Sequence, residues 1–427
     1  MIDLQQIRRD PGPARQALAR RGAAEELDRL LDLDRRRREL NTRIDEGRSE
    51  QNKLSARIEE LARSGGTDEP EFEQLRQRSA PMKEELKKLE AELAEVAEER
   101  DRLWAEVPNL PDPEAPDGTT EEDATELREV GERPAFDFEP LDHLELGQRH
   151  GWIEIEAAAQ ASGSRFAYLL GDLVLVELAL VRLALETLRP EGFVPAAPPV
   201  MVRESALFGT GFFPGEREMI YEVPEDELFL VGTSEVSLAA LHADAILTAD
   251  ELPRRYAGFS TCFRREAGAA GRDTRGIFRV HQFDKVEMLS FCEPGDSPDE
   301  HQRLLALEER ILQALEIPYR VVEIAAGDLG ASASRKFDCE AWVPSQRRFR
   351  EVTSCSNTTD YQARRLNSRY RPGEGASPEF LHTLNGTAVA VGRTLIALLE
   401  NGQRGDGTVA MPGALQDFGL PESIPTI

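Results

Sequence analysis

The sequence has no long hydrophobic run, which argues against a helix that crosses a membrane. A span needs about 20 consecutive apolar residues, but the longest candidate, 169–188, is interrupted by four charged side chains. The N-terminus also lacks a basic flank followed by an apolar stretch, so we expect no secretory signal. Together these absences predict a cytoplasmic protein with no membrane partner.

Cysteine is scarce, and the usual glycine-rich nucleotide motifs are missing. The four cysteines stand at 262, 292, 339 and 355, without the CxxC or Cys/His spacing of a zinc site. We interpret them as reduced thiols in or near a hydrophobic core rather than as metal ligands or disulfides. Neither GxGxxG nor a Walker A motif occurs, so any nucleotide would have to bind on another scaffold.

Positive charge is in deficit, with 52 Lys and Arg against 79 Asp and Glu and a net charge of −27. Binding of nucleic acid depends largely on Lys and Arg, so an RNA-binding surface would have to be a local patch. Residues 1–110 are nearly balanced in charge, and most of the acidic excess follows them.

The first 107 residues form a charged zone with few aromatics and a helical pattern. Two tracks of apolar residues are separated by the helix breakers of 64–70. They predict an antiparallel coiled-coil hairpin of two helices, each of about 30 residues and ~45 Å long. Pro81 should kink the second helix or delay its start. The tracks are Leu40, Ile44, Leu54, Ile58 and Leu61, then Phe72, Leu75, Met82, Leu86, Leu89, Leu93, Val96 and Leu103.

Periodicity alone leaves the role of this hairpin open. Most heptad patterns belong to oligomerisation or scaffold elements, and an arginine-rich helix face is usually just solvated. The alternative is a phosphate-binding face formed by Arg35, Arg36, Arg38, Arg43 and Arg48.

The rest of the chain divides into a short linker and a large domain. Residues 108–135 are rich in Pro, Asp and Glu and predict an exposed linker, whereas 136–427 hold nearly all the aromatics. A long apolar helix is expected over 173–188. Turns separate most strand candidates, which favours an α+β fold with an antiparallel sheet over a parallel one. The strand candidates are 228–231, 256–263, 285–291, 319–324, 336–343 and 349–353.

One stretch of this domain has the residue types of a nucleotide site. It is interpreted as a strand at 263–266, a glycine-rich loop over 267–276 and a return strand over 278–287. Alternation would place Arg264 and Glu266 on one face, opposite Phe283 and Glu287. A guanidinium suits a phosphate, and a phenyl ring can stack on a base. A salt-bridged surface hairpin is equally compatible with this stretch alone.

Two further clusters favour the nucleotide site. Glu351 and Ser354 supply oxygen ligands suited to Mg²⁺. Arg393 stands at the start of an apolar helix, where its charge would face a cleft.

These clusters, in this order, resemble motifs 2 and 3 of class II aminoacyl-tRNA synthetases, and their residue sequences are similar to those of bacterial seryl-tRNA synthetases. The resemblance covers essentially the whole chain, and an ordered set of this kind is very specific. Its other segments are 7–11, 33–37, 192–199 (motif 1, which builds the dimer interface in that family), 208–211, 230–235, 337–345, 351–357, 362–365 and 385–387.

The resemblance implies an antiparallel class II catalytic domain that binds ATP and Mg²⁺. Arg264 and Arg393 would be the catalytic residues, Arg264 on the α-phosphate and Arg393 near the γ-phosphate. Phe283 and Arg393 would sandwich the adenine, and Glu266 would contact its edge. Glu351 and Ser354 would hold Mg²⁺. The remaining implied ATP contacts are Arg265, Val280, Val352 and Thr353.

The resemblance also implies the amino acid and the RNA. Glu287 and Thr387 would receive the serine hydroxyl, which would reject alanine by leaving polar groups unpaired. The hairpin would bind the long variable arm of tRNA-Ser on the other subunit of a homodimer, with the arginines named above as candidate contacts. The selenocysteine tRNA is a further expected substrate. The remaining serine-pocket residues implied are Thr233, Ser234, Glu235 and Arg264.

Three alternatives are weighed against this interpretation. Relatives that charge carrier proteins lack the N-terminal arm, which is present here. A scaffold paralogue would be expected to have lost Arg264, Glu287, Glu351 or Arg393, and all four are present. A copy that confers resistance to a seryl-adenylate antibiotic would look nearly identical.

Overall fold

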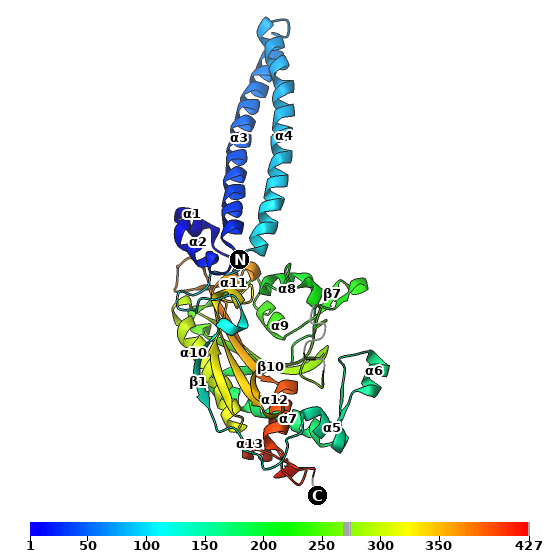
Figure 1. Ribbon diagram of the computed structural model, residues 1–427. Coiled ribbons are helices and arrows are strands. Elements are labelled where there is room, and N and C mark those ends of the chain that lie inside the picture. The colour runs from blue at the N-terminus through cyan, green and yellow to red at the C-terminus, as the bar shows by residue number, and fades with distance from the viewer. Residues whose placement is uncertain (268–272, 274, 426–427) are drawn as a thin grey trace. The chain divides into compact units, whose positions relative to one another are not determined.

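The computed structural model describes residues 1–267, 273 and 275–425, so most of the expected glycine-rich loop lies outside the described residues. The chain divides into two compact units, whose elements are labelled in Figure 1. One unit is Asp3–Val107, and the other is Met1–Ile2 with Pro108–Ile427.

The first unit is helical. Its four helices are α1 (Leu4–Arg9), α2 (Pro11–Ala19), α3 (Ala24–Arg63) and α4 (Pro70–Glu106). The Asp3 and Asp10 side chains accept backbone N–H bonds at the first turns of α1 and α2, which satisfies donors that a helix start leaves unpaired. The long α3–α4 hairpin confirms the predicted coiled coil, but its helices have 40 and 37 residues, where about 30 each were expected.

The hairpin is held together by the predicted apolar tracks. Leu40, Ile44 and Leu89 form a buried cluster between α3 and α4. At Gly47, a Cβ atom would lie 2.8 Å from the Leu86 side chain, so the missing side chain lets the helices approach. α4 begins at Pro70 and contains Pro81 in its interior, so Pro81 does not delay the helix start.

The second unit is built on an eight-stranded sheet with the order β1-β11-β12-β13-β16-β10-β9-β4. All neighbouring pairs are antiparallel except β4–β9, so the predicted α+β class with an antiparallel sheet is confirmed. The strands are β1 (Thr125–Val130), β4 (Phe193–Ala196), β9 (Arg254–Phe263), β10 (Gln282–Cys292), β11 (Tyr319–Glu323), β12 (Arg335–Val343), β13 (Arg348–Asn357) and β16 (His382–Ala390).

Three helices bury their apolar faces against this sheet: α7 (Asp172–Leu188), α10 (Ser297–Ala314) and α12 (Val391–Gly402). The other helices are α5 (His143–His150), α6 (Glu156–Ser162), α8 (Glu204–Thr210), α9 (Glu235–Ala240), α11 (Tyr361–Leu366) and α13 (Gly413–Gln416). The short strands are β2 (Ile153–Glu154), β3 (Tyr168–Leu169), β5 (Met201–Val202), β6 (Glu222–Val223), β7 (Leu228–Leu230), β8 (Ile246–Thr248), β14 (Arg369–Arg371), β15 (Glu379–Phe380), β17 (Val409–Ala410) and β18 (Ser423–Ile424).

The segment expected to be a linker, 108–135, differs from that expectation. It contains β1, which pairs with β11 at the edge of the sheet, and the buried Asn109 side chain donates hydrogen bonds to the Ser332 and Thr358 carbonyls. The acidic, proline-rich composition gave no indication of an edge strand, because one face of such a strand can remain polar.

All four cysteines are buried and free. Across the described part of the chain, no helix is both long enough and apolar enough to pass through a membrane.

Candidate active site

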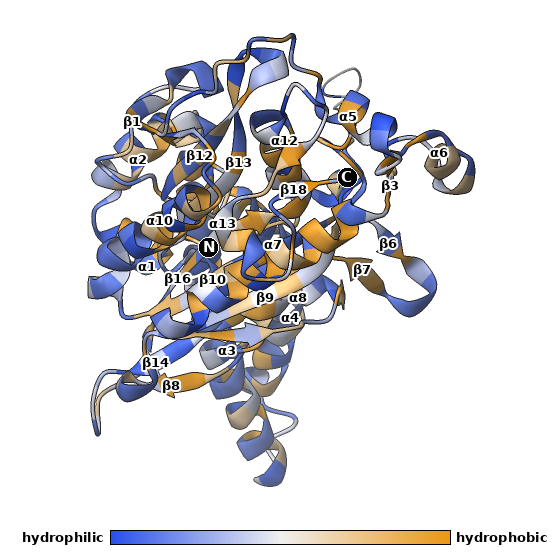
Figure 2. Cartoon of the chain, turned by 90° about the horizontal axis from the view of Figure 1, so that it is seen from below, coloured by the Kyte–Doolittle hydropathy of each residue, from blue (hydrophilic) through white to orange (hydrophobic). Residues whose placement is uncertain are grey.

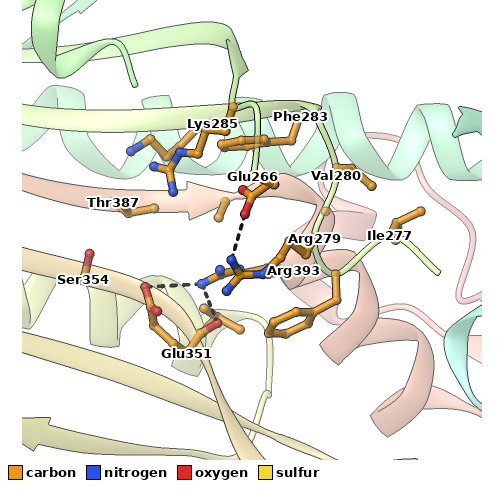
Figure 3. Close-up of a pocket in the computed structure, with 15 residues that line it drawn as sticks. Glu266, Ile277, Arg279, Val280, Phe283, Lys285, Glu351, Ser354, Thr387 and Arg393 are labelled. Atoms are coloured by element: carbon orange, nitrogen blue, oxygen red, sulfur yellow. Dashed lines mark hydrogen bonds and ion pairs between the residues drawn. The ribbon is translucent and has the colours of Figure 1, made fainter. Parts of the chain in front are cut away.

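A cavity of about 100 Å³ lies where β10, β13, β16 and α12 meet, beside the segment that follows β9. Figure 3 shows its lining side chains. Both cationic and anionic groups line it, which suits a ligand that carries both phosphates and an amine. The residues that line it are Arg264, Glu266, Ile277, Phe278, Arg279, Val280, Phe283, Lys285, Glu351, Val352, Ser354, Thr387, Ala390, Gly392 and Arg393.

Arg264 and Glu266 reach the cavity, but not as members of a strand. β9 ends at Phe263 and Glu266 has a φ of +50°, so the prediction that both share a strand face is wrong. The Arg264 backbone N–H instead donates to the His281 carbonyl at 2.9 Å, and its Nε donates to the Gly232 carbonyl at 3.1 Å. These bonds fix the guanidinium between the return strand and the segment that leads to α9.

The carboxylate of Glu266 and the ring of Phe283 both have partners within the cavity wall. Arg279 Nη1 donates to Glu266 Oε2 at 2.7 Å, as drawn in Figure 3. The Arg264 guanidinium carbon lies 5.3 Å from the Phe283 ring centre, within the range of a cation–π contact.

Glu351 and Arg393 form the opposite wall. Arg393 Nη1 donates to the Glu351 carbonyl at 3.0 Å and lies 3.3 Å from its Oε1 (Figure 3). Burial raises the pKa of Glu351, but Arg393, Lys336 and Arg264 outweigh it and hold that pKa at about 2. The carboxylate is therefore ionised at neutral pH, as a metal ligand requires.

The oxygens of Glu351 and Ser354 fit a Mg²⁺ ion, because both side chains line the same cavity from β13. Asp338 lies directly across from Ser354 on β12 and carries a further buried carboxylate. The described residues contain no group of three or more His, Cys, Asp or Glu side chains that could hold a metal. Mg²⁺ commonly needs only one or two protein ligands when phosphates supply the rest.

A buried polar corner adjoins the cavity. Glu287 of β10 is paired with Thr387 of β16, and the Thr387 hydroxyl donates to Glu287 Oε2 at 3.4 Å. Lys285 forms an ion pair with the same carboxylate. Burial raises the pKa of Glu287, although Lys285 and Arg264 oppose the shift.

Glu235, at the start of α9, contributes the second carboxylate of this corner. Its Oε1 accepts hydrogen bonds from Gln362 and Asn385 at 2.7 and 3.0 Å. Burial, together with the negative charge of Glu287, raises the pKa of Glu235 to about 7.

Six predicted residues of the ATP and serine sites are not among those that line the cavity. Glu235 and Glu287 form the adjoining corner, and the side chains of the other four have partners elsewhere. The guanidinium of Arg265 lies near the Tyr221 ring, and the Thr353 hydroxyl donates to Glu308 on α10. The Ser234 hydroxyl donates to the Gly258 carbonyl, and the Thr233 hydroxyl accepts the Glu235 N–H. None of these four side chains is among the contacts proposed below.

Several lining residues were not predicted. Lys285 stands in the same motif as Phe283 and Glu287, and its alternation with them in β10 was a usable signal. Phe278 lies between two guanidinium groups, 3.9 Å from Arg350 and 4.9 Å from Arg393. No sequence pattern marks that stacking, because it depends on how β13 and α12 meet.

The predicted arginines of the hairpin are all exposed and all paired with acidic side chains. Exposure of their side chains ranges from 43% to 64%. Four of the five arginines pair with exposed carboxylates, and such surface pairs are worth only about 0–1 kcal/mol, so they do not prevent exchange for a phosphate. Arg38 instead pairs with the buried Asp34, which has Arg8, Arg37 and Arg100 as further partners. The pairs are Arg35 with Asp32 and Glu39, Arg36 with Glu92, Arg38 with Asp34, Arg43 with Glu85 and Arg48 with Glu90.

Comparison with known proteins identifies this architecture. Residues 1–111 match the seryl-tRNA synthetase N-terminal domain, and 220–402 match the tRNA synthetase class II core domain (G, H, P, S and T). The serine–tRNA ligase of Acidothermus cellulolyticus is 52% identical over 98% of both chains, and that of Thermobifida fusca is 48% identical over 98% of this chain and 97% of its own. The chain belongs to the seryl-tRNA synthetase family.

Solved structures of the same family agree over nearly the full length. Seryl-tRNA synthetase from Pyrococcus horikoshii, complexed with ATP, shares 39% identity and a TM-score of 0.91 over 99% of both chains. The cytoplasmic serine–tRNA ligase from Naegleria fowleri, in complex with AMP, shares 34% identity and a TM-score of 0.84 over 97% of this synthetase and 95% of its own chain.

Proposed function

We propose that this chain is an ATP-dependent serine–tRNA ligase that forms seryl-adenylate and transfers serine to the 3′ end of tRNA-Ser. Membership of the seryl-tRNA synthetase family supports the reaction. The observation that carries the mechanism is the convergence of Arg264, Lys285 and Arg393 on one cavity beside the buried carboxylates Glu235 and Glu287. The cationic side chains would bind the phosphates of ATP, and the carboxylates would bind the amino acid.

ATP would bind with its phosphates between Arg264 and Arg393 and its adenine against Phe283. The Gly232 carbonyl already orients Arg264, so little reorganisation is needed to neutralise charge at the α-phosphate. Glu266 would contact the adenine amino group, and Val280 and Val352 would line the base and sugar. In a filled site, the flat face of Arg393 would stack on the adenine.

Mg²⁺ would be held by Glu351 and Ser354, where it supplies Lewis-acid neutralisation of the phosphate oxygens. The ionised state of Glu351 and its place on the cavity wall support this assignment. Arg393 lies against the same carboxylate, so it would help hold Glu351 in position.

Serine would occupy the corner formed by Glu235, Glu287 and Thr387. Its ammonium would pair with Glu235, and its hydroxyl would bond to Glu287 and Thr387, which already lie within hydrogen-bond distance of each other. Alanine would leave those buried groups unpaired, at a cost of about 1–3 kcal/mol. Threonine would be rejected by the limited volume.

The chemistry then follows from positioning. The serine carboxylate attacks the α-phosphorus in line, and pyrophosphate leaves as Arg264 and Arg393 offset the developing charge. The 3′-terminal hydroxyl of the tRNA next attacks the seryl carbonyl, and AMP leaves. No side-chain nucleophile is required, which agrees with the burial of all four cysteines.

The α3–α4 hairpin would recognise the long variable arm of tRNA-Ser through its shape and phosphates. Arg35, Arg36, Arg38, Arg43 and Arg48 are exposed enough to exchange their acidic partners for phosphates. Recognition of this kind does not read the anticodon, so we extend the proposal to the selenocysteine tRNA. We also propose that the reaction takes place in the cytoplasm, because the similar ligase from Naegleria fowleri is named as cytoplasmic.

The functional unit would be a homodimer. Most of the large hydrophobic side chains that the described residues leave exposed come from 168–201, and Figure 2 shows the hydrophobic character of α7. The exposed Val174, Leu175 and Leu178 lie at positions i, i+1 and i+4 of α7 and share one face of that helix. An exposed hydrophobic patch typically marks a protein interface. The proposed contact surface, called the apolar patch below, comprises Tyr168, Leu170, Val174, Leu175, Leu178, Val194 and Met201.

ATP–pyrophosphate exchange with each of the twenty amino acids tests the activation step. Aminoacylation of tRNA-Ser, with and without residues 28–106, tests the arm. We expect serine-dependent exchange that survives the deletion and charging that does not. Exchange with no amino acid, or with a different one, would overturn the proposed substrate, and charging that ignores the deletion would overturn the role of the hairpin.

A further inference from the structure

Gln362 of α11 is fully buried and lies behind the proposed serine site. Its Nε2 donates to Glu235 Oε1 at 2.7 Å and to the Thr210 carbonyl at 3.1 Å. Its Oε1 accepts from Thr383 at 2.8 Å and from Thr358 at 3.4 Å. Both amide donors are therefore used, and the amide oxygen accepts from Thr383, whereas the Thr358 hydroxyl lies closer to the Thr383 carbonyl, at 2.7 Å.

This arrangement permits only one orientation of the amide. A flipped Gln362 would point its oxygen at the Glu235 carboxylate and at the Thr210 carbonyl, and its N–H groups would meet hydroxyls that already have other partners. Four elements, α8, α9, α11 and β16, meet at this side chain, and a buried hydrogen-bond network of this kind is rigid.

These hydrogen bonds restrict the position of the Glu235 carboxylate. Gln362 and Asn385 both donate to Oε1, whereas no described residue donates a hydrogen bond to Oε2. One oxygen is thus tied to the protein scaffold, and the other is left to a ligand. A carboxylate held in this way presents a fixed acceptor to an ammonium group.

We propose that Gln362 is a positioning residue for amino-acid binding, which fixes Glu235 so that its second oxygen receives the ammonium of serine. This inference rests on the proposed role of Glu235. Gln362 does not touch the substrate, and neither the cavity lining nor the predicted site includes it. It stands in the 362–365 segment, for which the sequence indicated no role.

The test is Gln362→Met, which keeps the length of the side chain and removes both donors. Hydrogen bonds to charged groups are worth about 1.5–3 kcal/mol, so we expect the KM for serine in pyrophosphate exchange to rise by about 10-fold or more, with the KM for ATP unchanged. Gln403→Met is the matched control, because Gln403 is a buried amide that bonds Leu141 and the Glu400 carbonyl away from the cavity.

A pH profile separates positioning from a general loss of structure. Gln362 lowers the pKa of Glu235, as does Lys285, whereas burial and the charges of Glu287 and Glu216 raise it. Without the amide, the acid limb of kcat/KM for serine should move to higher pH, and Gln403→Met should leave it in place. An unshifted limb together with an unchanged serine KM would overturn the proposal.

A double-mutant cycle with Glu235→Gln separates the proposed role of Glu235 from the proposed role of Gln362. If Glu235→Gln leaves the serine KM unchanged, the proposed role of Glu235 fails. If Glu235→Gln raises that KM but Gln362→Met does not, only the positioning role fails. We expect both to raise it and the double variant to be no worse than Glu235→Gln alone, because two residues that act through one contact are not additive.

Discussion

At the scale of single residues, the proposed serine site places two carboxylates in one buried corner. Glu235 and Glu287 both have raised pKa values, chiefly because burial disfavours their charged forms. Lys285 is ion-paired with Glu287 and not with Glu235, so the two carboxylates have different roles in the proposed site. Glu287 has a cation from the protein, and Glu235 is left to receive one from the substrate.

The raised pKa of Glu235, about 7, predicts a pH dependence of serine recognition. Below that pKa the group is protonated and cannot form an ion pair with an ammonium, so kcat/KM for serine should rise with pH through about 7 and then level off. Pyrophosphate exchange at subsaturating serine, from pH 6 to 8.5, measures it. Glu235→Gln should abolish the limb, and a limb that persists in that variant would assign it to another group.

Residue identities were predictable from the sequence to a larger extent than residue geometry. The motifs pointed to Arg264, Phe283, Glu351 and Arg393, and all four line one cavity. The face shared by Arg264 and Glu266 was not predictable, because β9 stops at Phe263 and a positive φ turns Glu266. Strand alternation applies only while the strand continues.

At the scale of elements, the contact between α10 and the sheet contains a buried acid that the mechanism does not use. Glu308 is fully buried, and its Oε2 accepts from the Thr353 hydroxyl at 2.7 Å. Burial raises its pKa well above the ordinary value; the Thr353 bond opposes the shift, and the nearby negative charges of Asp338 and Glu287 add to it. The neutral form of the side chain is therefore favoured in the folded protein.

Glu308→Gln should stabilise the fold at neutral pH. In the unfolded chain Glu308 ionises above a pKa of about 4.3, whereas the folded pKa is raised. The stabilising contribution of the acid is thus complete below the unfolded pKa and declines with rising pH, by up to ~1.4 kcal/mol per unit. Glutamine does not titrate and retains an oxygen for Thr353. Urea unfolding should give no advantage near pH 4.5 and a clear one at pH 8.

The matched control is Glu300→Gln on the same helix. Glu300 is also buried, but it receives two N–H bonds from Arg255, at 2.5 and 2.6 Å. Neutralising it leaves a partly buried guanidinium without its counter-ion, which is destabilising. We expect this variant to lose stability at pH 8, and a similar loss in Glu308→Gln would contradict a neutral buried acid at Glu308.

Elements differed in how readily the sequence indicated them. Strand-like runs bounded by turns identified β9–β13, and apolar positions with a regular helical spacing identified the α3–α4 hairpin. Three strands of the main sheet, β1, β4 and β16, were missed, β1 and β16 for opposite reasons. β1 is an edge strand with exposed side chains, and β16 is central and interrupted by Asn385 and Gly386, residues that usually mark turns.

At the scale of the whole molecule, the proposed function depends on two features, the hairpin and the apolar patch. The hairpin carries the proposed RNA contacts, and the apolar patch of 168–201 carries the proposed dimer contact. If each arm serves the active site of the other subunit, charging depends on both features at once, whereas serine activation depends on neither arm.

Mixed dimers test this dependence. One chain lacks residues 28–106 and keeps its active site, and the other keeps its arm but carries Arg393→Ala. Each homodimer should fail to charge tRNA-Ser, the first for want of an arm and the second for want of activation. The mixed dimer should regain up to half of the charging rate per dimer, because one intact site then faces an arm supplied by its partner.

Leu178→Glu provides the matched control for assembly. Leu178 is 56% exposed on α7, so a carboxylate there costs the isolated chain little but would be buried and unpaired at the proposed interface. Introduced into both chains, it should give monomers in analytical ultracentrifugation and abolish complementation. Mixed dimers that assemble but do not charge would show that each arm serves its own active site, because the only intact site would then belong to the chain without an arm.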